Sequence, residues 1–184
     1  RFGKLADIIA FIEQARELGM QVIIELLIQH TSDAHPWFQE ARRNPKSPFR
    51  DYYLWSDNDD DDTPPMFPGV EKSIWTWDDE AGQYYRHMFY RHEPDLNLTS
   101  PAVIKEIENI ILFWLKLGVS GFRLDAASHL TTQAGGGDEE KGLWILEHLR
   151  RLITQHNPQA ILLGEVDVEV EAYKDYFGNN DRLH

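Results

Sequence analysis

Apolar and polar residues alternate along this chain in blocks that predict helices and strands in turn. Apolar positions three and four residues apart indicate amphipathic helices, whereas short, nearly continuous apolar runs indicate strands buried on both faces. These patterns predict helices over 4–18, 101–117 and 143–155, and strands over 21–28, 121–124 and 160–165. Because each helix is followed by a strand, we expect consecutive βα units of a parallel barrel or open sheet.

The residues from about 31 to 97 follow neither period. Pro, Trp, Tyr and Asp dominate there, with a helix predicted over 36–42 and short strands among the aromatic residues after Trp75. More than ~60 residues between a strand and the next helix is far beyond an ordinary loop, and such insertions are usually functional. The acidic tract 57–62 is a solvated loop by default, with a calcium site as the alternative.

Polar residues stand at or near the C-terminal end of each predicted strand. They are Glu25 and His30 for the first strand, Arg123, Asp125 and His129 for the second, and Glu165 for the third. Chemistry in β/α proteins gathers where the carboxyl ends of parallel strands meet. Arg123 can keep Asp125 ionised and aim it, although a structural Arg–Asp pair between neighbouring strands would leave the same pattern.

Two carboxylates on consecutive strands suit glycoside hydrolysis, in which one attacks the anomeric carbon and the other protonates the leaving oxygen. Asp125 has Arg123 beside it, so we expect it to stay ionised. Glu165 has no basic neighbour in sequence, so we expect partial burial to raise its pKa and keep it protonated as a general acid. His30 and His129 are placed to hydrogen-bond a sugar hydroxyl, and a structural role is an equal alternative for either imidazole.

Composition narrows the classes of function. The 184 residues are 42% hydrophobic with a formal net charge of −13, which argues against a nucleic-acid partner. No apolar run approaches the ~20 residues of a membrane helix, so we expect no membrane partner and a cytoplasmic location. There is no cysteine for disulfides or thiolate metal sites, and no histidine pair at metal-binding spacing. The six Trp and seven Tyr suit stacking on sugars or packing in a core. The oligomeric state is left open.

Four segments, in this order, resemble motifs of the alpha-amylase superfamily, glycoside hydrolase family 13. They are Val22–His30, Glu93–Asn97, Gly121–His129 and Leu163–Glu165. The second of these, together with 30–38 and 51–57, is similar to the trehalose synthase, alpha-glucosidase and oligo-1,6-glucosidase branch. The resemblance spans nearly the whole chain.

The resemblance implies an α/β fold: a partial (β/α)8 TIM barrel, about the third to fifth βα units, with an inserted domain B. Residues 1–30 and 98–184 would belong to the barrel and 31–97 to domain B. By the same resemblance, Asp125 is the nucleophile, Glu165 the general acid/base, and His30, Arg123 and His129 bind substrate. The substrate would be an α-glucoside or maltooligosaccharide, with no cofactor required and calcium allowed.

The chain departs from the family pattern at several positions. Glu25 stands where the family usually has Asp, Gln29 where it has Asn, and Glu93 where it has Gln. The family's third catalytic carboxylate, on its seventh strand, has no counterpart in these residues, so we expect an internal piece of a longer enzyme. The alternative is a carbohydrate-binding or transport-associated module that kept the fold, which the Glu25 and Gln29 departures favour.

Overall fold

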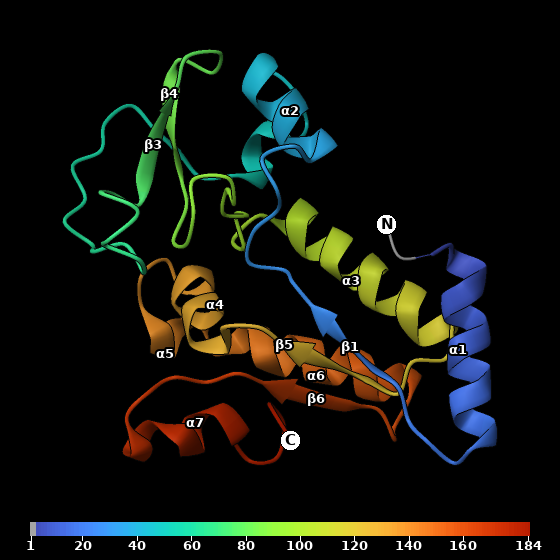
Figure 1. Cartoon of the computed structure of the whole chain (residues 1–184). Helices are drawn as coiled ribbons and strands as arrows, with labels where there is room; N and C mark the ends of the chain where they lie inside the picture. The colour runs from blue at the N-terminus through green and yellow to red at the C-terminus, as the bar shows by residue number, and fades with distance from the viewer. Residues whose placement is uncertain (1–2) are drawn as a thin grey trace. The chain divides into compact units, whose positions relative to one another are not determined.

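A computed structural model describes residues 3–184, which divide into two compact units (Figure 1). The first unit joins the N-terminal residues up to Leu26 with Lys105–His184, and the second is Leu27–Ile104. Within the described residues, no helix is long and apolar enough to cross a membrane.

The first unit contains a parallel sheet of three strands in the order β1 (Ile23–Leu26), β5 (Gly121–Leu124) and β6 (Ile161–Gly164). A helix precedes each strand along the chain, as the hydrophobic pattern predicted. These helices are α1 (Leu5–Glu17), α3 (Pro101–Lys116) and α6 (Trp144–His156). The strands are in register so that Glu25, Arg123 and Leu163 lie side by side across the sheet.

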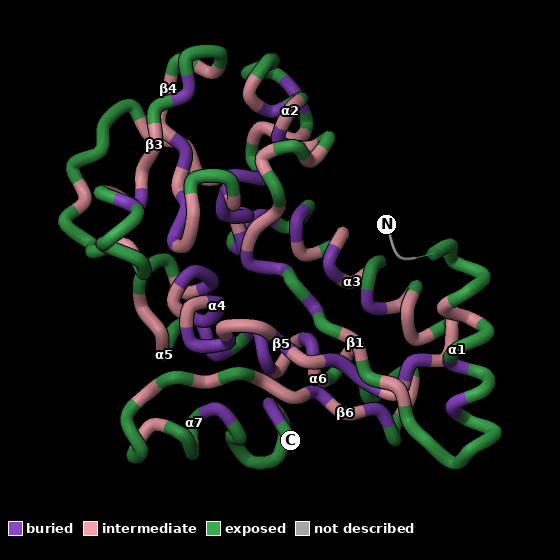
Figure 2. The backbone as a smooth tube through the Cα atoms, in the orientation of Figure 1, coloured by how far each residue is buried: buried purple, intermediate pink, exposed green. Residues whose placement is uncertain are grey.

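The central strand β5 is the most deeply buried of the three, and it appears mostly purple in Figure 2. Phe122 and Leu124 are completely buried, as is Leu162 on β6. Strand β1 differs from its prediction, because it is shorter than the run 21–28 and Ile23 is 39% exposed. Among the described residues β1 pairs with β5 alone, so only one of its edges is covered.

Gly121 begins β5 because no other residue fits there. Its φ is +155°, and a Cβ at this position would overlap the backbone carbonyl oxygen of Ile161 on the neighbouring strand. Glycine is the residue that tolerates both this conformation and the close approach of another backbone. The glycine therefore lets β5 and β6 pair from their first residues.

Small and polar residues follow Asp125 and predict a loop there, but this stretch is helical in the structure, which corrects the prediction. Helix α4 (Ala127–Ala134) and the short α5 (Glu139–Gly142) flank the glycine-rich turn. Leu130 and Thr131 are fully buried, and the Thr131 hydroxyl lies 3.1 Å from that of Tyr176. Tyr176 belongs to α7 (Tyr173–Phe177), which follows the 3-10 turn η2 (Val170–Ala172). Tertiary packing of a small buried face thus explains this helix.

The second unit is built around an antiparallel sheet in the order β2 (Trp55–Ser56), β4 (Gln83–Arg86) and β3 (Trp75–Asp78). It also holds α2 (Pro36–Arg43) and the 3-10 turn η1 (Arg50–Tyr52). Aromatic rings form its core: Phe38 of α2 packs against Tyr53, Trp55 and Tyr85 with ring centroids 5.0 to 5.7 Å apart. The helix and the strands predicted among the aromatic residues are confirmed.

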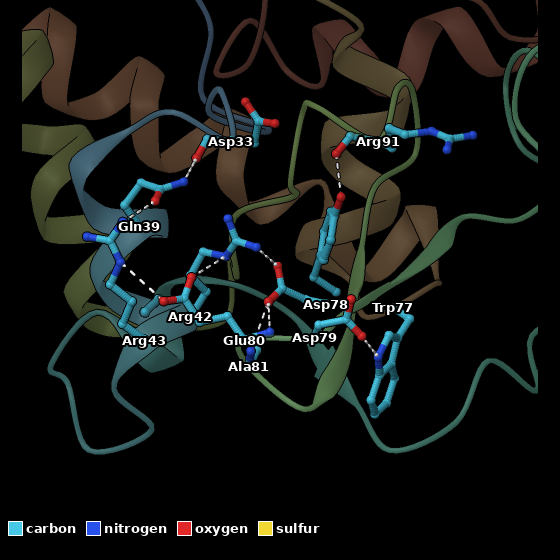
Figure 3. A network of polar contacts seen from close by, with 12 residues as sticks. Asp33, Gln39, Arg42, Arg43, Trp77, Asp78, Asp79, Glu80, Ala81 and Arg91 are labelled. Atoms are coloured by element: carbon cyan, nitrogen blue, oxygen red, sulfur yellow. Dashed lines mark hydrogen bonds and ion pairs between the residues drawn. The ribbon is translucent and has the colours of Figure 1, made fainter.

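A network of hydrogen bonds and ion pairs connects helix α2 to the turn between β3 and β4 (Figure 3). Asp78 is buried and accepts hydrogen bonds from the backbone amides of Glu80 and Ala81. Its second oxygen lies 2.8 Å from Arg42 Nη2, and Glu80 also pairs with Arg42 and Arg43. A buried carboxylate is tolerated here because donors satisfy both of its oxygens.

Candidate functional site

The predicted carboxylates Asp125 and Glu165 each follow directly after a strand. Asp125 comes after β5 and Glu165 after β6, and these two strands are parallel and hydrogen-bonded to each other. The strands run in register and end together, so the two residues lie at the same edge of the sheet. Strand pairing thus brings together two residues that are far apart in sequence.

The guanidinium group of Arg123 joins this pair and a third carboxylate. Its Nη1 donates to Asp125 Oδ1 at 3.0 Å and also to Glu25 Oε1, while Nη2 donates to Glu165 Oε2 at 2.8 Å. The hydrogen bond to Glu25 is the largest of the causes that raise the pKa of Arg123. One permanently charged guanidinium group therefore hydrogen-bonds three carboxylates, which leaves a net negative charge at this end of the sheet.

The surroundings of Glu165 differ from those expected. Its side chain is 56% exposed rather than partly buried, and its basic neighbour is Arg123. Neighbours in sequence do not reveal this contact, because Arg123 lies 42 positions away and reaches Glu165 across the sheet. Register explains the reach: Arg123 pairs with Leu163, two residues before Glu165. The Asp125 side chain is 37% exposed and does have Arg123 as its partner, as expected.

A second connection between the two strand ends runs through the backbone. The Glu165 amide donates to the carbonyl of Leu124 at 2.9 Å, and the Glu165 carbonyl accepts from the amide of Ala127 at 2.7 Å. These two partners stand on either side of Asp125. Between Asp125 and Ala127, Ala126 adopts a left-handed conformation with φ 45° and ψ 49°. Nothing in the sequence pattern marks Ala126 or this connection.

The two histidines expected to bind substrate lie in different units. His129 is in the first turn of α4 and is half-buried. His30 is in the second unit, where it forms an antiparallel bridge with Asp95. There its Nε2 lies 4.0 Å from Glu93 Oε1. The ring centroids of His30 and Phe89 are 5.7 Å apart, and the two rings pack in a T-shaped arrangement. Backbone pairing thus joins the first motif to the segment Glu93–Asn97 within one unit.

Asp95 is a buried acid within the segment Glu93–Asn97, and the sequence predicts no role for it. It is completely buried, and its Oδ2 accepts from Arg86 Nη1 at 2.5 Å and from the Met88 amide at 3.0 Å. Burial raises the pKa of Asp95 to about 6 and outweighs the opposing effect of Arg86. A single polar residue in a short motif carries no signal of burial, so only the fold reveals this pair.

The described residues hold no group of three or more His, Asp or Glu side chains arranged to bind a metal ion. In the acidic tract 57–62, Asp61 instead accepts from the Trp75 indole at 3.1 Å and from the Thr63 amide. The calcium alternative for this tract therefore gains no support from the geometry.

Comparisons with known proteins show what the whole chain is similar to. Residues 1–184 match the model of the alpha-amylase catalytic domain. The chain is 40% identical over 184 residues to a trehalose synthase of Pimelobacter sp. (strain R48), covering 98% of this chain and 32% of that protein. It is 44% identical over 183 residues to a trehalose synthase of Thermus thermophilus, covering 94% of this chain and 18% of that protein. It thus spans a third or less of the length of these curated relatives.

Solved structures support the fold. The alpha-glucosyl transfer enzyme XgtA matches with a TM-score of 0.84 and 31% identity, covering all of this chain and 40% of that one. The fold class expected from the sequence, α/β and part of a (β/α)8 barrel, is confirmed by this match and by the parallel sheet with a helix before each strand.

Proposed function

The chain belongs to the alpha-amylase family, and from that premise we propose that it forms part of a retaining enzyme acting on α-glucosidic bonds. The enzyme hydrolyses these bonds or transfers a glucosyl group within maltose-like α-glucosides. Names of the relatives, which include trehalose synthases and oligo-1,6-glucosidases, support both outcomes. Residues 1–30 and 98–184 would belong to the barrel, and 31–97 to its inserted domain B.

In the proposed reaction, the Asp125 carboxylate attacks the anomeric carbon and forms a covalent glucosyl ester. The bond between that carbon and the glycosidic oxygen breaks as Glu165 gives its proton to this oxygen. Glu165, now ionised, takes a proton from water or a sugar hydroxyl, whose oxygen then displaces Asp125 from the anomeric carbon. Water yields hydrolysis, and a sugar hydroxyl yields transfer. No cofactor enters either step.

One observation carries this assignment: Asp125 and Glu165 follow neighbouring parallel strands and are bonded to the same guanidinium group. Arg123 bonds Asp125 through Oδ1, and no hydrogen bond of Oδ2 is among those described. An ionised carboxylate with one bonded oxygen keeps the other for attack. In this proposal His30 and His129 hold hydroxyl groups of the sugar that reacts.

Asp125→Asn tests the nucleophile. In the enzyme extended to the length of its relatives, this change should lower kcat by about 10³-fold or more on maltose and on an aryl α-glucoside alike. The matched control is Glu171→Gln, which also replaces a carboxylate with an amide but at an exposed position outside the site. Near-normal kcat in the Asp125→Asn enzyme would refute the assignment.

Glu165→Gln tests the acid. A substrate with a good leaving group needs little proton donation. The decrease in kcat caused by Glu165→Gln should therefore be far smaller on the aryl α-glucoside than on maltose, where a decrease of about 10²–10⁴-fold is expected. Equal losses on both substrates would contradict general acid catalysis by Glu165.

The competing function is a carbohydrate-binding or transport-associated module without turnover. Glu25 and Gln29, which depart from the family pattern, favour it. Assays on residues 1–184 and on the extended enzyme separate the two: activity in the extended enzyme supports the proposal, and sugar binding without turnover in either supports the module. The cytoplasmic location expected from the sequence stays a prediction.

A further inference from the structure

We propose that Ala126 is a positioning residue, whose left-handed conformation holds the backbones of Asp125 and Glu165 at a fixed separation. This inference rests on the proposed function, because it concerns the two carboxylates assigned there. It adds a residue with no reactive side chain to the machinery of the site.

The conformation of Ala126 is rare for its residue type. Its φ of 45° lies in the left-handed region, where a Cβ crowds the following carbonyl oxygen, and glycine is the usual occupant. Among the described residues, only Ala126 and Asn180 have a positive φ without being glycine. Asn tolerates this region through its short polar side chain, whereas Ala has no such compensation. Contacts around Ala126 must therefore hold it there.

The hydrogen bonds that hold Ala126 are those that join the two strand ends. Leu124 accepts from the Glu165 amide at 2.9 Å, and Ala127 donates to the Glu165 carbonyl at 2.7 Å. Both backbone groups of Glu165 are thus bound to residues that bracket Asp125 and Ala126. The chain has to turn sharply between Leu124 and Ala127 to place both partners against one residue, and Ala126 is where it turns.

Small residues on both sides let the strand ends approach closely. Ala127 is fully buried, and a Cβ built on Gly164 would lie 3.3 Å from the Ala127 Cβ and 2.5 Å from Leu183 Cδ1. A larger side chain at either position would push the start of α4 away from β6. Sequence and packing therefore agree on a close, fixed contact beside Asp125.

The backbone connection does something that Arg123 does not. Arg123 also joins Asp125 and Glu165, but through a long side chain that is 38% exposed. Side chains of this kind change rotamer readily, whereas two backbone hydrogen bonds around one turn leave little freedom. A displacement of about 1 Å at reacting groups can cost about 10²-fold in rate, so the backbone connection bears directly on catalysis.

Ala126→Gly tests the proposal, because glycine accepts the same φ without strain and also frees the turn to move. In the full enzyme we expect a Tm equal to or above that of the parent, with kcat on maltose about tenfold lower and KM little changed. Asn180→Gly is the matched control, since it relieves a left-handed residue (φ 67°) in an exposed turn; its kcat should equal that of the parent. Stability and kcat moving in opposite directions is a result that a purely structural role does not produce.

A second readout does not depend on activity. Amide hydrogen exchange at Ala127, whose N–H is bonded to the Glu165 carbonyl, should be about tenfold faster in Ala126→Gly than in the parent, with no change in Asn180→Gly. Unchanged exchange, or a kcat within twofold of the parent, would overturn the inference. A parent enzyme that turns over no α-glucoside would overturn the proposed function instead, and exchange at Ala127 would still decide whether Ala126 holds the turn.

Discussion

Replacing Asp95 with Asn should change how the stability of the second unit depends on pH. Burial raises the pKa of Asp95 from its ordinary value of 3.8 to about 6, although Arg86 and the Met88 amide favour the charged form. The folded state therefore binds this proton more tightly than the unfolded state does. The stability that this group contributes is complete below pH 3.8 and is lost as the pH rises through about 6.

The size of the effect follows from the shift. About 2 pH units at 1.36 kcal/mol each amount to about 3 kcal/mol, and water near Arg86, whose side chain is 16% exposed, screens part of it. We expect 2 to 3 kcal/mol, roughly a quarter of the stability of a typical domain. Asn has nearly the same shape and can still accept from the Met88 amide, but it does not titrate.

The assay is urea unfolding of the full chain, parent and Asp95→Asn, at intervals between pH 4 and pH 7.5. Tryptophan fluorescence reports on the second unit through Trp37, Trp55, Trp75 and Trp77. The free energy of unfolding of the variant minus that of the parent should rise by about 2 to 3 kcal/mol from pH 4 to pH 6.5. Parallel curves across this range would refute the reasoning.

Arg86→Met is the complementary change, because it leaves the buried carboxylate without its cation. At neutral pH it should cost about 3–5 kcal/mol, since a single buried charge is far more expensive than a pair. The pH at which stability is lost should also move upward, because the pKa of Asp95 rises further when Arg86 is gone. If the Arg86→Met protein lost stability over the same pH range as the parent, Arg86 would have no effect on the pKa of Asp95.

Three further predictions follow from buried contacts. Burial lowers the pKa of His87, so the stability that its neutral imidazole contributes is present above pH 6.5 and is lost as the pH falls below it. The Tm of His87→Gln should therefore decrease less than that of the parent as the pH falls below 6.5. Tyr176→Phe removes a buried hydroxyl that donates to Glu139 at 2.6 Å, which should cost about 1–2 kcal/mol in urea unfolding. Gly121→Ala drives a Cβ into the backbone of Ile161 and should cost about 3 kcal/mol or more by the same measurement.

Periodicity alone was enough to predict the elements that carry the site. Helix and strand patterns have strong local signals, such as the stripe of buried residues on α6 and the apolar run that became β5. The prediction failed at α4, where local propensity is weak and a buried face formed by Leu130 and Thr131 decides the structure. It also overstated the burial of β1, because an apolar run does not say which edges of a strand are paired.

The environments of the predicted site residues depend on register, which sequence spacing does not reveal. Arg123 was assigned to Asp125 because the two are neighbours in sequence, and that contact is present at 3.0 Å. Its contact with Glu165 depends on how β5 pairs with β6. The left-handed turn at Ala126 was equally out of reach, because alanine gives no sign of a positive φ. The sequence predicts which groups react, and strand pairing decides what each of them contacts.

Glu25 shows how one extra methylene can be absorbed at such a site. The family usually has the shorter Asp at this position, yet Glu25 lies directly opposite Arg123 in the sheet and reaches Nη1, the same nitrogen that serves Asp125. Nη1 carries two hydrogens and donates to both carboxylates, so Glu25 shares with Asp125 the positive charge of the guanidinium group. The backbone connection between Asp125 and Glu165 does not pass through Arg123, and it holds their separation whichever carboxylate the guanidinium favours. The departure at Glu25 should therefore alter the electrostatics around Asp125 more than its position.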